Sequence, residues 1–363
     1  MTLELLRPLF TVYKLKSAPS ADILSNEFCF FSKTDRELSL VCPSALAVDD
    51  VIAREDDWRA FRIDGQLDFP FVGFFAVSTF DTDYVFIKEK QLYPAYRALS
   101  ESGYEIKGIE AFARCVAVVN KFLSDIAQKL GNVIQTAYVT GSTVYDDFHP
   151  GFSDLDFFFI AARTLTEADF HELHKLYTQY RALGDGWFSA LEGEILSPES
   201  LESSFGPTVY WGTGKDRFAD RYTLSGFSMR TLLERGILLT GPDLRERIPV
   251  PDDACILRQS RHLLATVRKY ALEPNDNPRY ADWIFLLSQT MYTLSTGKQT
   301  SKTRAARWLK SVSTDPLLMK SLEKAEEIRM NPANTDKESL KMLKNPIQFL
   351  ADKLDDSLRI ENI

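Results

Sequence analysis

Two aspartates one residue apart, Asp154 and Asp156, are the side chains whose type and spacing point most directly to chemistry. They follow a glycine–serine pair, Gly141-Ser142, and lead into the apolar run Phe157–Ile160. Alternate side chains of a strand share one face, so a strand here would point both carboxylates the same way. Carboxylate oxygens on one face can hold a divalent cation and suit Mg²⁺. The pattern therefore predicts a magnesium site at a strand.

The alternative is that these residues are only structural. A lone Asp-x-Asp pattern is common, and Asp154 could belong to a turn while Asp156 faces solvent. Here the pair enters a strand that is too apolar for a surface position. Carboxylates beside such a strand are costly unless they are paired or bound to a metal. The functional interpretation is therefore favoured.

A metal site behind a glycine–serine turn fits the transfer of a nucleotidyl group. This chemistry needs a metal that offsets the polyphosphate charge, a base that deprotonates the attacking hydroxyl, and in-line placement. Ser142, on the turn opened by Gly141, can contact a phosphate oxygen together with exposed backbone N–H groups. A third carboxylate on a neighbouring strand would be the base or a further metal ligand, and Glu192 and Glu194 are the candidates.

The elements around these residues form a coherent α/β unit. A helix is predicted over 109–130, and a strand ends at Thr140, just before the turn. A second helix begins after Thr166, where Asp169 lies three residues on and resembles a capping box. A strand predicted over Trp187–Leu196 carries both glutamates.

The flanking regions predict two further domains, so the expected fold class is α+β. Segments 10–15, 38–41 and 60–63 alternate like strands, and 74–79 and 84–87 are two further strand candidates. A helix over 91–102 stops at Gly103. Beyond Pro251 the pattern is helical, over 255–271, 280–294, 302–311, 316–329 and 338–354. The expected division is a small α+β domain over 1–107, a catalytic α/β domain with a mixed sheet over 108–250 and an all-helical domain over 251–363.

Bulk composition limits the partners. The formal net charge of -8 and the pI near 5.3 argue against a nucleic-acid polymer, because phosphate backbones need a basic face. The four cysteines show no CxxC spacing, so no zinc or redox motif follows. The N-terminus has no signal-peptide pattern, and no apolar run approaches the length of a membrane span. We expect a cytoplasmic protein that binds neither nucleic acid nor membrane.

Four segments together resemble the streptomycin/spectinomycin class of aminoglycoside adenylyltransferases, which are antibiotic-resistance enzymes. The resemblance covers about the last two-thirds of the chain. The narrowest motif is Tyr292, Thr296-Gly297-Lys298, Ser301-Lys302 and Ala305-Ala306-Arg307-Trp308. The other segments are Gly141–Ile160, Ala190-Leu191-Glu192 and Leu232–Pro242.

This resemblance implies roles for individual residues, with ATP and Mg²⁺ as cofactors. The two aspartates would bind Mg²⁺, and Glu192 would be the catalytic glutamate and a further metal ligand. Lys302 would contact the ATP phosphates, at a helix start that favours phosphate. The set assigned to the nucleotide is Gly141, Ser142, Ser153 and Lys302.

The sequence departs from this family where the drug would bind. Family members carry acidic residues at the start of the helix that holds Tyr292, and these bind a cationic drug. Here the segment reads Arg279-Tyr280-Ala281-Asp282-Trp283, in which Arg279 would repel an ammonium group. Asp282, the acidic residue of this segment, and Glu194 are the candidate acceptor-binding residues. The expected acceptor is aminoglycoside-like without being a typical aminoglycoside.

The N-terminal region resembles the ACT-type ligand-sensing domains of cytosolic arginine sensors. This resemblance implies an amino-acid effector or a dimerising role, and thus a homodimer. The family usually places a helix between two of the matching segments, whereas here only Pro70–Phe75 separate them. The matching segments are Glu37–Pro43, Trp58–Phe61, Gly65, Leu67–Phe69 and Val77–Tyr84.

The leading hypothesis is an enzyme that transfers AMP from ATP to a hydroxyl of a small molecule. A second hypothesis is that the acceptor is a protein side chain, as in protein-AMPylating nucleotidyltransferases. A third is a regulatory protein that senses an amino acid and keeps only the nucleotidyltransferase fold.

Overall fold

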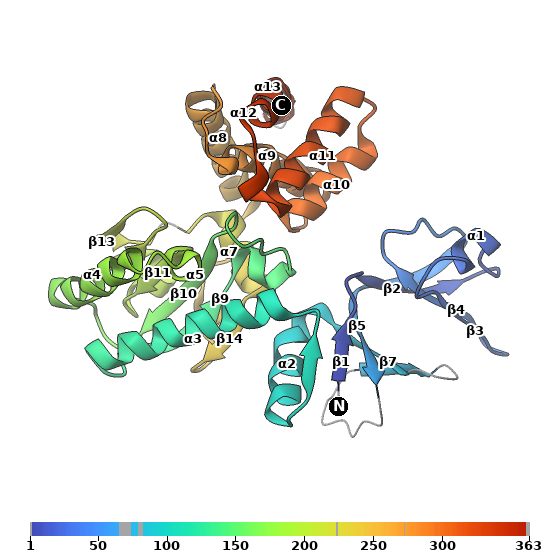
Figure 1. Ribbon diagram of the computed structural model, residues 1–363, viewed down its shortest axis with the longest axis horizontal. Helices are drawn as coiled ribbons and strands as arrows, with labels where there is room; N and C mark the ends of the chain where they lie inside the picture. The colour runs from blue at the N-terminus through green and yellow to red at the C-terminus, as the bar shows by residue number, and fades with distance from the viewer. Residues whose placement is uncertain (1, 65–73, 79–82, 223, 272, 361–363) are drawn as a thin grey trace. The chain divides into compact units, whose positions relative to one another are not determined.

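A computed structural model describes residues 2–64, 74–78, 83–222, 224–271 and 273–360 (Figure 1). The chain forms two compact units, Met1–Glu110 and Ala111–Ile363. Helices, 3₁₀ turns included, take up 49% of the described residues and strands 24%, which confirms the predicted α+β class. The finer division at residues 107 and 250 stays a prediction.

The N-terminal unit is built around the long strand β5, which pairs antiparallel with β1, β2 and β7. The strand order is β3-β4-β2-β5-β1-β8. In addition, β7 pairs with β5, and β6 pairs with β7. The strands are β1 (Thr2–Leu5), β2 (Phe10–Leu15), β3 (Phe30–Lys33), β4 (Leu38–Pro43), β5 (Val51–Asp64), β6 (Phe74–Ser78), β7 (Asp83–Lys88) and β8 (Glu105–Lys107). The helices are α1 (Ala21–Leu24) and α2 (Leu92–Glu101).

The predicted strands of this unit and the helix ending before Gly103 are confirmed. An aromatic cluster holds one face, where Phe86 stacks on Phe75 at 4.6 Å between ring centroids and meets Phe10 edge-on at 5.2 Å. The resemblance to ACT domains rests partly on segment 65–69, which lies outside the described residues.

The second unit contains a six-stranded mixed sheet in the order β13-β12-β11-β10-β9-β14. β10 and β11 are parallel, whereas the other neighbours are antiparallel. The strands are β9 (Ile134–Val139), β10 (Leu155–Ala161), β11 (Leu191–Leu196), β12 (Phe205–Trp211), β13 (Asp216–Arg221) and β14 (Ile237–Thr240). The helices beside it are α3 (Glu110–Leu130), α4 (Glu167–Ala182), α5 (Gly186–Ser189), α6 (Ser200–Ser203) and α7 (Gly226–Arg235).

β10 is apolar because both of its faces are covered. Phe157 packs on Phe122 of α3 at 5.2 Å between ring centroids, and the opposite-facing Phe158 meets Tyr222 at 5.8 Å. A strand buried on both sides reads as a continuous apolar run rather than an alternating one. The packing therefore fixes where β10 starts, and with it the position of the two aspartates.

The structure corrects the strand predicted over 187–196. Residues Gly186–Ser189 form the short helix α5, and the strand begins only at Leu191. Asp185 caps this turn, since its carboxylate accepts the N–H of Trp187 at 2.7 Å. The capping box at α4 is confirmed, with Thr166 and Asp169 each accepting a backbone N–H of the other.

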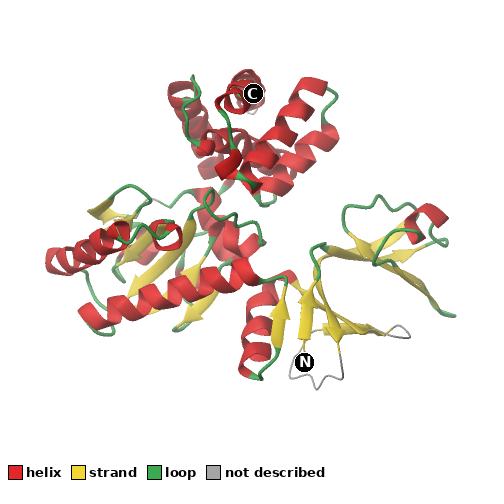
Figure 2. Ribbon diagram, viewed as in Figure 1, coloured by secondary structure: helices red, strands yellow, loops and turns green. Residues whose placement is uncertain are grey.

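From Asp253 onward, the regular structure of the described residues is entirely helical (Figure 2). The predicted helix over 338–354 is divided at Leu343, and α9 is preceded by a 3₁₀ turn, Pro278–Ala281. The helices are α8 (Asp253–Tyr270), α9 (Asp282–Thr296), α10 (Lys302–Val312), α11 (Pro316–Met330), α12 (Lys337–Met342) and α13 (Lys344–Ile360). None of the helices in the described part of the chain is long and apolar enough to cross a membrane.

Gly193 sets the distance between the two strands of the parallel pair. A Cβ atom at this position would come within 2.0 Å of the backbone carbonyl oxygen of Phe157, which cannot move without separating β10 from β11. Gly193→Ala should therefore lower the stability by an amount on the order of 1–3 kcal/mol, as overpacking does. Calorimetric melting of the purified protein measures the loss.

Gly214→Ala is the matched control, because a Cβ there meets nothing within 4 Å beyond its chain neighbours. Equal melting temperatures for the two variants would contradict the close approach of the strands.

Candidate active site

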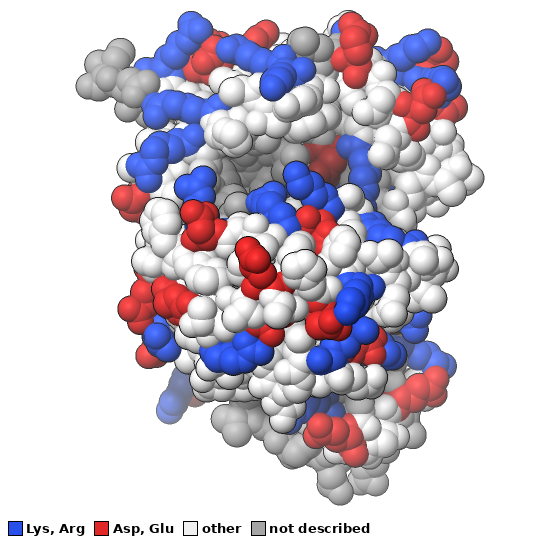
Figure 3. Space-filling model, turned by 90° about the vertical axis from the view of Figure 1, so that its left-hand side faces the viewer, with Lys and Arg blue, Asp and Glu red and all other residues white. Residues whose placement is uncertain are grey.

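The site is a cavity of about 670 Å³ within the second unit. The sheet and the turn after β9 form one wall, and the helices α7–α10 form the others. The space-filling view shows a hollow with an acidic group inside it and basic side chains at its edge (Figure 3). All of the residues predicted from the sequence line this cavity: Gly141, Ser142, Ser153, Asp154, Asp156, Glu192, Glu194, Asp282 and Lys302.

Three carboxylates crowd the sheet wall. Asp156 lies directly opposite Glu192 in the register of the parallel pair, and Asp154 immediately precedes β10. Burial, followed by the charge of Glu192, raises the pKa of Asp154 to about 6. Burial and the neighbouring charges of Asp154 and Glu192 raise the pKa of Asp156 well above its usual value. The site therefore needs positive charge.

Gly141 makes room for this cluster. It is the first residue of the 3₁₀ turn Gly141–Tyr145 that follows β9, and its φ is +66°. A Cβ atom here would lie 1.9 Å from Oδ2 of Asp156, so a side chain is excluded by space as well as by conformation. The hydroxyl of Ser142 is 3.5 Å from the backbone carbonyl oxygen of Asp154 and ties the turn to the start of the strand.

Glu192 is held at one side of the cavity by two weak contacts. The Tyr210 hydroxyl donates to Oε1, and the Thr213 N–H donates to Oε2, both at 3.3 Å. Burial and the charge of Glu192 raise the pKa of Tyr210, which stays a protonated donor. Glu194, on the same strand face, is only 3% exposed. Glu192 is thus the more accessible candidate base.

Lys302 approaches from the helical wall, at the first position of α10. Ser301 caps that helix, since its hydroxyl accepts the N–H of Arg304 at 3.2 Å. The Lys302 ammonium group pairs with both carboxylate oxygens of Asp282, at 2.7 and 3.0 Å. Asp282, expected to bind the acceptor, is therefore already neutralised by a lysine.

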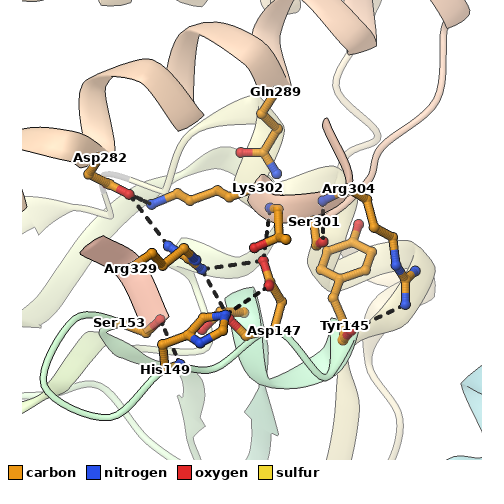
Figure 4. A network of polar contacts seen from close by, with 12 residues as sticks. Tyr145, Asp147, His149, Ser153, Asp282, Gln289, Ser301, Lys302, Arg304 and Arg329 are labelled. Carbon is orange, nitrogen blue, oxygen red and sulfur yellow. Dashed lines mark hydrogen bonds and ion pairs between the residues drawn. The ribbon is translucent and has the colours of Figure 1, made fainter. Parts of the chain in front are cut away.

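A buried ion network, missed in the sequence, underlies this pair (Figure 4). Arg329 of α11, 1% exposed, donates to Oδ2 of Asp147 at 3.3 Å and lies 3.7 Å from Oδ1 of Asp282. Asp147 also accepts the N–H of Thr303 at 3.1 Å, at the start of α10. Burial acts to raise the pKa of Asp147, but the hydrogen bond to His149 and the Arg329 charge outweigh it and lower the pKa.

Ser153 has a structural contact in this region. Its hydroxyl accepts the N–H of His149 at 3.0 Å, and the His149 ring lies 3.2 Å from Asp147 (Figure 4). Ser153 therefore holds the loop that carries Asp147. Its predicted contact with the nucleotide stays a prediction.

Arg279 contacts the metal-binding candidate Asp154. Its guanidinium donates to Oδ1 of Asp154 at 2.6 Å, with about a third of each side chain exposed. The sequence singled out Arg279 only as a charge unfavourable to a cationic acceptor. Its positive charge could be read from the sequence, but its partner Asp154 could not, because the two residues are 125 positions apart.

The carboxylates fit a divalent metal by their chemistry. Among the described residues, no three or more His, Cys, Asp or Glu side chains are placed so that they could bind one metal ion together. Mg²⁺ usually binds through only one or two carboxylates and takes its other ligands from water and substrate phosphates. The pair Asp154 and Asp156 meets that requirement.

Part of the second unit matches a family of known proteins. Residues 119–187 match the nucleotidyltransferase domain family, a stretch that includes the glycine–serine turn and both aspartates. No curated protein sequence is matched. The fold is similar to that of spectinomycin adenyltransferase AAD(9) from Enterococcus faecialis, solved with ATP and spectinomycin, with a TM-score of 0.50 and 16% identity over 66% of this chain and 98% of that chain.

Two other solved structures are similar over smaller parts of the chain. Protein Atu0741 from Agobacterium tumefaciens is 24% identical over 29% of this chain and 90% of that chain, with a TM-score of 0.26. A mutant of the toxin-antitoxin MntA-HpeT is 14% identical over 41% of this chain and 92% of that chain, with a TM-score of 0.20. The chain contains a nucleotidyltransferase domain and is a transferase enzyme.

Removing one member of the buried network should be strongly destabilising. Arg329→Met leaves the Asp147 carboxylate buried without its guanidinium partner, a loss of about 3–5 kcal/mol for a broken buried pair. Chemical denaturation gives the change in unfolding free energy.

Arg307→Met is the matched control, because Arg307 pairs with Glu326 and is 63% exposed. Exposed pairs contribute about 0–1 kcal/mol. Similar losses for the two variants would contradict the account of the network.

Asp156→Asn should raise the melting temperature of the metal-free protein at pH 7.5. The folded-state pKa of Asp156 lies above that of the unfolded chain, so its contribution to stability is present at low pH and is lost as the pH rises through the folded value. Asparagine carries no charge, so the gain over wild type should grow from pH 4 to pH 7.5.

The measurement is thermal melting in EDTA across this range, with Asp352→Asn, 73% exposed, as the control. A lower melting temperature for Asp156→Asn at pH 7.5 would mean that the ionised carboxylate stabilises the fold, contrary to this account.

Proposed function

We propose that the protein is a Mg²⁺-dependent adenylyltransferase that transfers AMP from ATP to a hydroxyl of a small molecule. The observation that carries the proposal is the pairing of Asp156 with Glu192 across β10 and β11, with Asp154 beside them and Lys302 across the cavity. This arrangement gives a carboxylate wall for a metal and a basic group for the phosphates of one bound nucleotide.

In this proposal each residue has one role. Asp154 and Asp156 hold the Mg²⁺, which offsets the polyphosphate charge when bound. Glu192 accepts the proton of the attacking hydroxyl. Ser142 and Lys302 bind phosphate oxygens, with Lys302 leaving Asp282 to do so.

Glu194 and Asp282 are the acidic residues proposed to face the acceptor. Because Glu194 is almost fully buried and Asp282 is paired with Lys302, neither offers a free carboxylate to an ammonium group in this state. An aminoglycoside-like acceptor draws its support from the similar fold of AAD(9), which was solved with spectinomycin. We therefore propose an aminoglycoside-like hydroxyl compound whose binding depends less on positive charge than that of a typical aminoglycoside.

The N-terminal unit is proposed as a separate ligand-sensing or dimerising domain over about 1–107, ahead of a catalytic domain over 108–250 and a helical domain over 251–363. Its support is the compact sheet of Met1–Glu110 and the sequence resemblance to ACT domains. An amino acid is the proposed effector.

The test is pyrophosphate release from ATP and Mg²⁺ against a panel of aminoglycosides, spectinomycin and lincosamides, with Asp156→Asn as the negative control. Release that depends on one compound and is lost in the variant supports the proposal. Acceptor-independent label transfer from α-labelled ATP to protein would instead favour protein modification.

Glu192→Gln should lower kcat by about 100- to 10,000-fold, because the amide cannot accept the proton of the hydroxyl. The affinity for ATP should change little, since the phosphates are bound by other residues. Rate and nucleotide binding are measured on the same preparations.

Glu202→Gln is the control, because this glutamate of α6 is 65% exposed and pairs only at the surface with Arg247. Near wild-type kcat in Glu192→Gln would exclude Glu192 as the base.

A further inference from the structure

Arg279 is paired with Asp154, one of the two aspartates that are proposed to bind the metal. It lies in the 3₁₀ turn Pro278–Ala281, where Asn277 fixes the backbone by accepting the Arg279 N–H at 2.9 Å. Its guanidinium donates to Oδ1 of Asp154 at 2.6 Å. The backbone is thus anchored, while the long side chain reaches across the cavity to the sheet wall.

This ion pair and a bound metal compete for the same carboxylate. A guanidinium hydrogen-bonded to Asp154 would stand next to a divalent cation on that carboxylate, and the two positive charges repel each other strongly in a partly buried site. Metal binding must therefore weaken the pair or release Arg279 from it. Conversely, Arg279 must weaken the binding of metal alone.

A nucleotide offers the released guanidinium a new partner. A triphosphate that shares the metal brings phosphate oxygens to the vicinity of Asp154, and the planar fork of an arginine suits them. Among the cations that line the cavity in the described part of the chain, Lys302 and Arg329 are paired with Asp282, whereas Arg279 contacts Asp154.

We propose that Arg279 is a phosphate-binding residue that is held on Asp154 in the empty site and is released when metal and nucleotide bind together. The inference rests on the proposed function, since it assumes a metal-bound triphosphate in this cavity. It predicts coupling between the two ligands: metal alone binds weakly, and the metal–nucleotide complex binds well.

Arg279→Gln tests this exchange because it should change two affinities in opposite directions. The affinity for Mn²⁺ alone, measured by electron paramagnetic resonance without nucleotide, should rise by about 5-fold or more. The affinity for a non-hydrolysable ATP analogue with Mg²⁺, measured by calorimetry, should fall by about 10-fold. A general defect in folding would weaken both.

Two further variants complete the design. Arg279→Lys keeps the positive charge but not the fork, so its affinity for Mn²⁺ alone should stay near that of wild type while nucleotide binding is partly lost. Arg258→Gln, at an exposed position of α8, should change neither affinity.

An unchanged or weaker affinity for Mn²⁺ alone in Arg279→Gln would overturn the proposal. Unchanged affinity for the ATP analogue in this variant would also overturn it. If only the KM of an acceptor rose, Arg279 would bind an acidic group of the acceptor instead of the nucleotide. If the wild-type protein binds neither Mn²⁺ nor the analogue, the proposed function fails, and this inference fails with it.

Discussion

Repulsion among three carboxylates is the constraint on which the rest of the site depends. Asp154, Asp156 and Glu192 are brought together by the parallel pairing of β10 with β11, and burial makes ionisation of the two aspartates costly. The strand pairing is fixed by apolar packing on both faces of β10, so the cluster cannot relax by moving apart. Positive charge must come from elsewhere, and the helical wall supplies Arg279 and Lys302 to the cavity.

The buried network links this wall to the loop after β9. Asp147 of that loop contacts Arg329 of α11 and the backbone at the start of α10, where Lys302 lies. Through Asp282, the same arginine also stands next to the Lys302 ion pair. The position of the basic group across from the carboxylates is therefore set by contacts between residues far apart in sequence.

Much of the frame around the site could be predicted from local patterns. The run Phe157–Ile160 predicted β10, the capping box predicted the start of α4, and helical periodicity predicted the C-terminal helices. Local patterns misjudged 187–189, where the cap supplied by Asp185 favours a helical turn over continuation of the strand. They also missed the break at Leu343.

The ion pairs of the site could not be predicted from the sequence. Asp147 and Arg329 are 182 residues apart, and no periodicity or motif connects them. Arg279 was noticed for its charge, but its contact with Asp154 follows only from the fold, which brings its side chain from the 3₁₀ turn before α9 to that carboxylate. The same holds for Lys302, whose helix start was predicted while its pairing with Asp282 was not.

The most direct test of the account is anomalous diffraction from crystals grown with Mn²⁺ and a non-hydrolysable ATP analogue. The account predicts a manganese peak between the carboxylates of Asp154 and Asp156, with the triphosphate beside it and Glu192 facing open space for an acceptor. A nucleotide bound without manganese at these aspartates, or manganese bound elsewhere in the cavity, would contradict it.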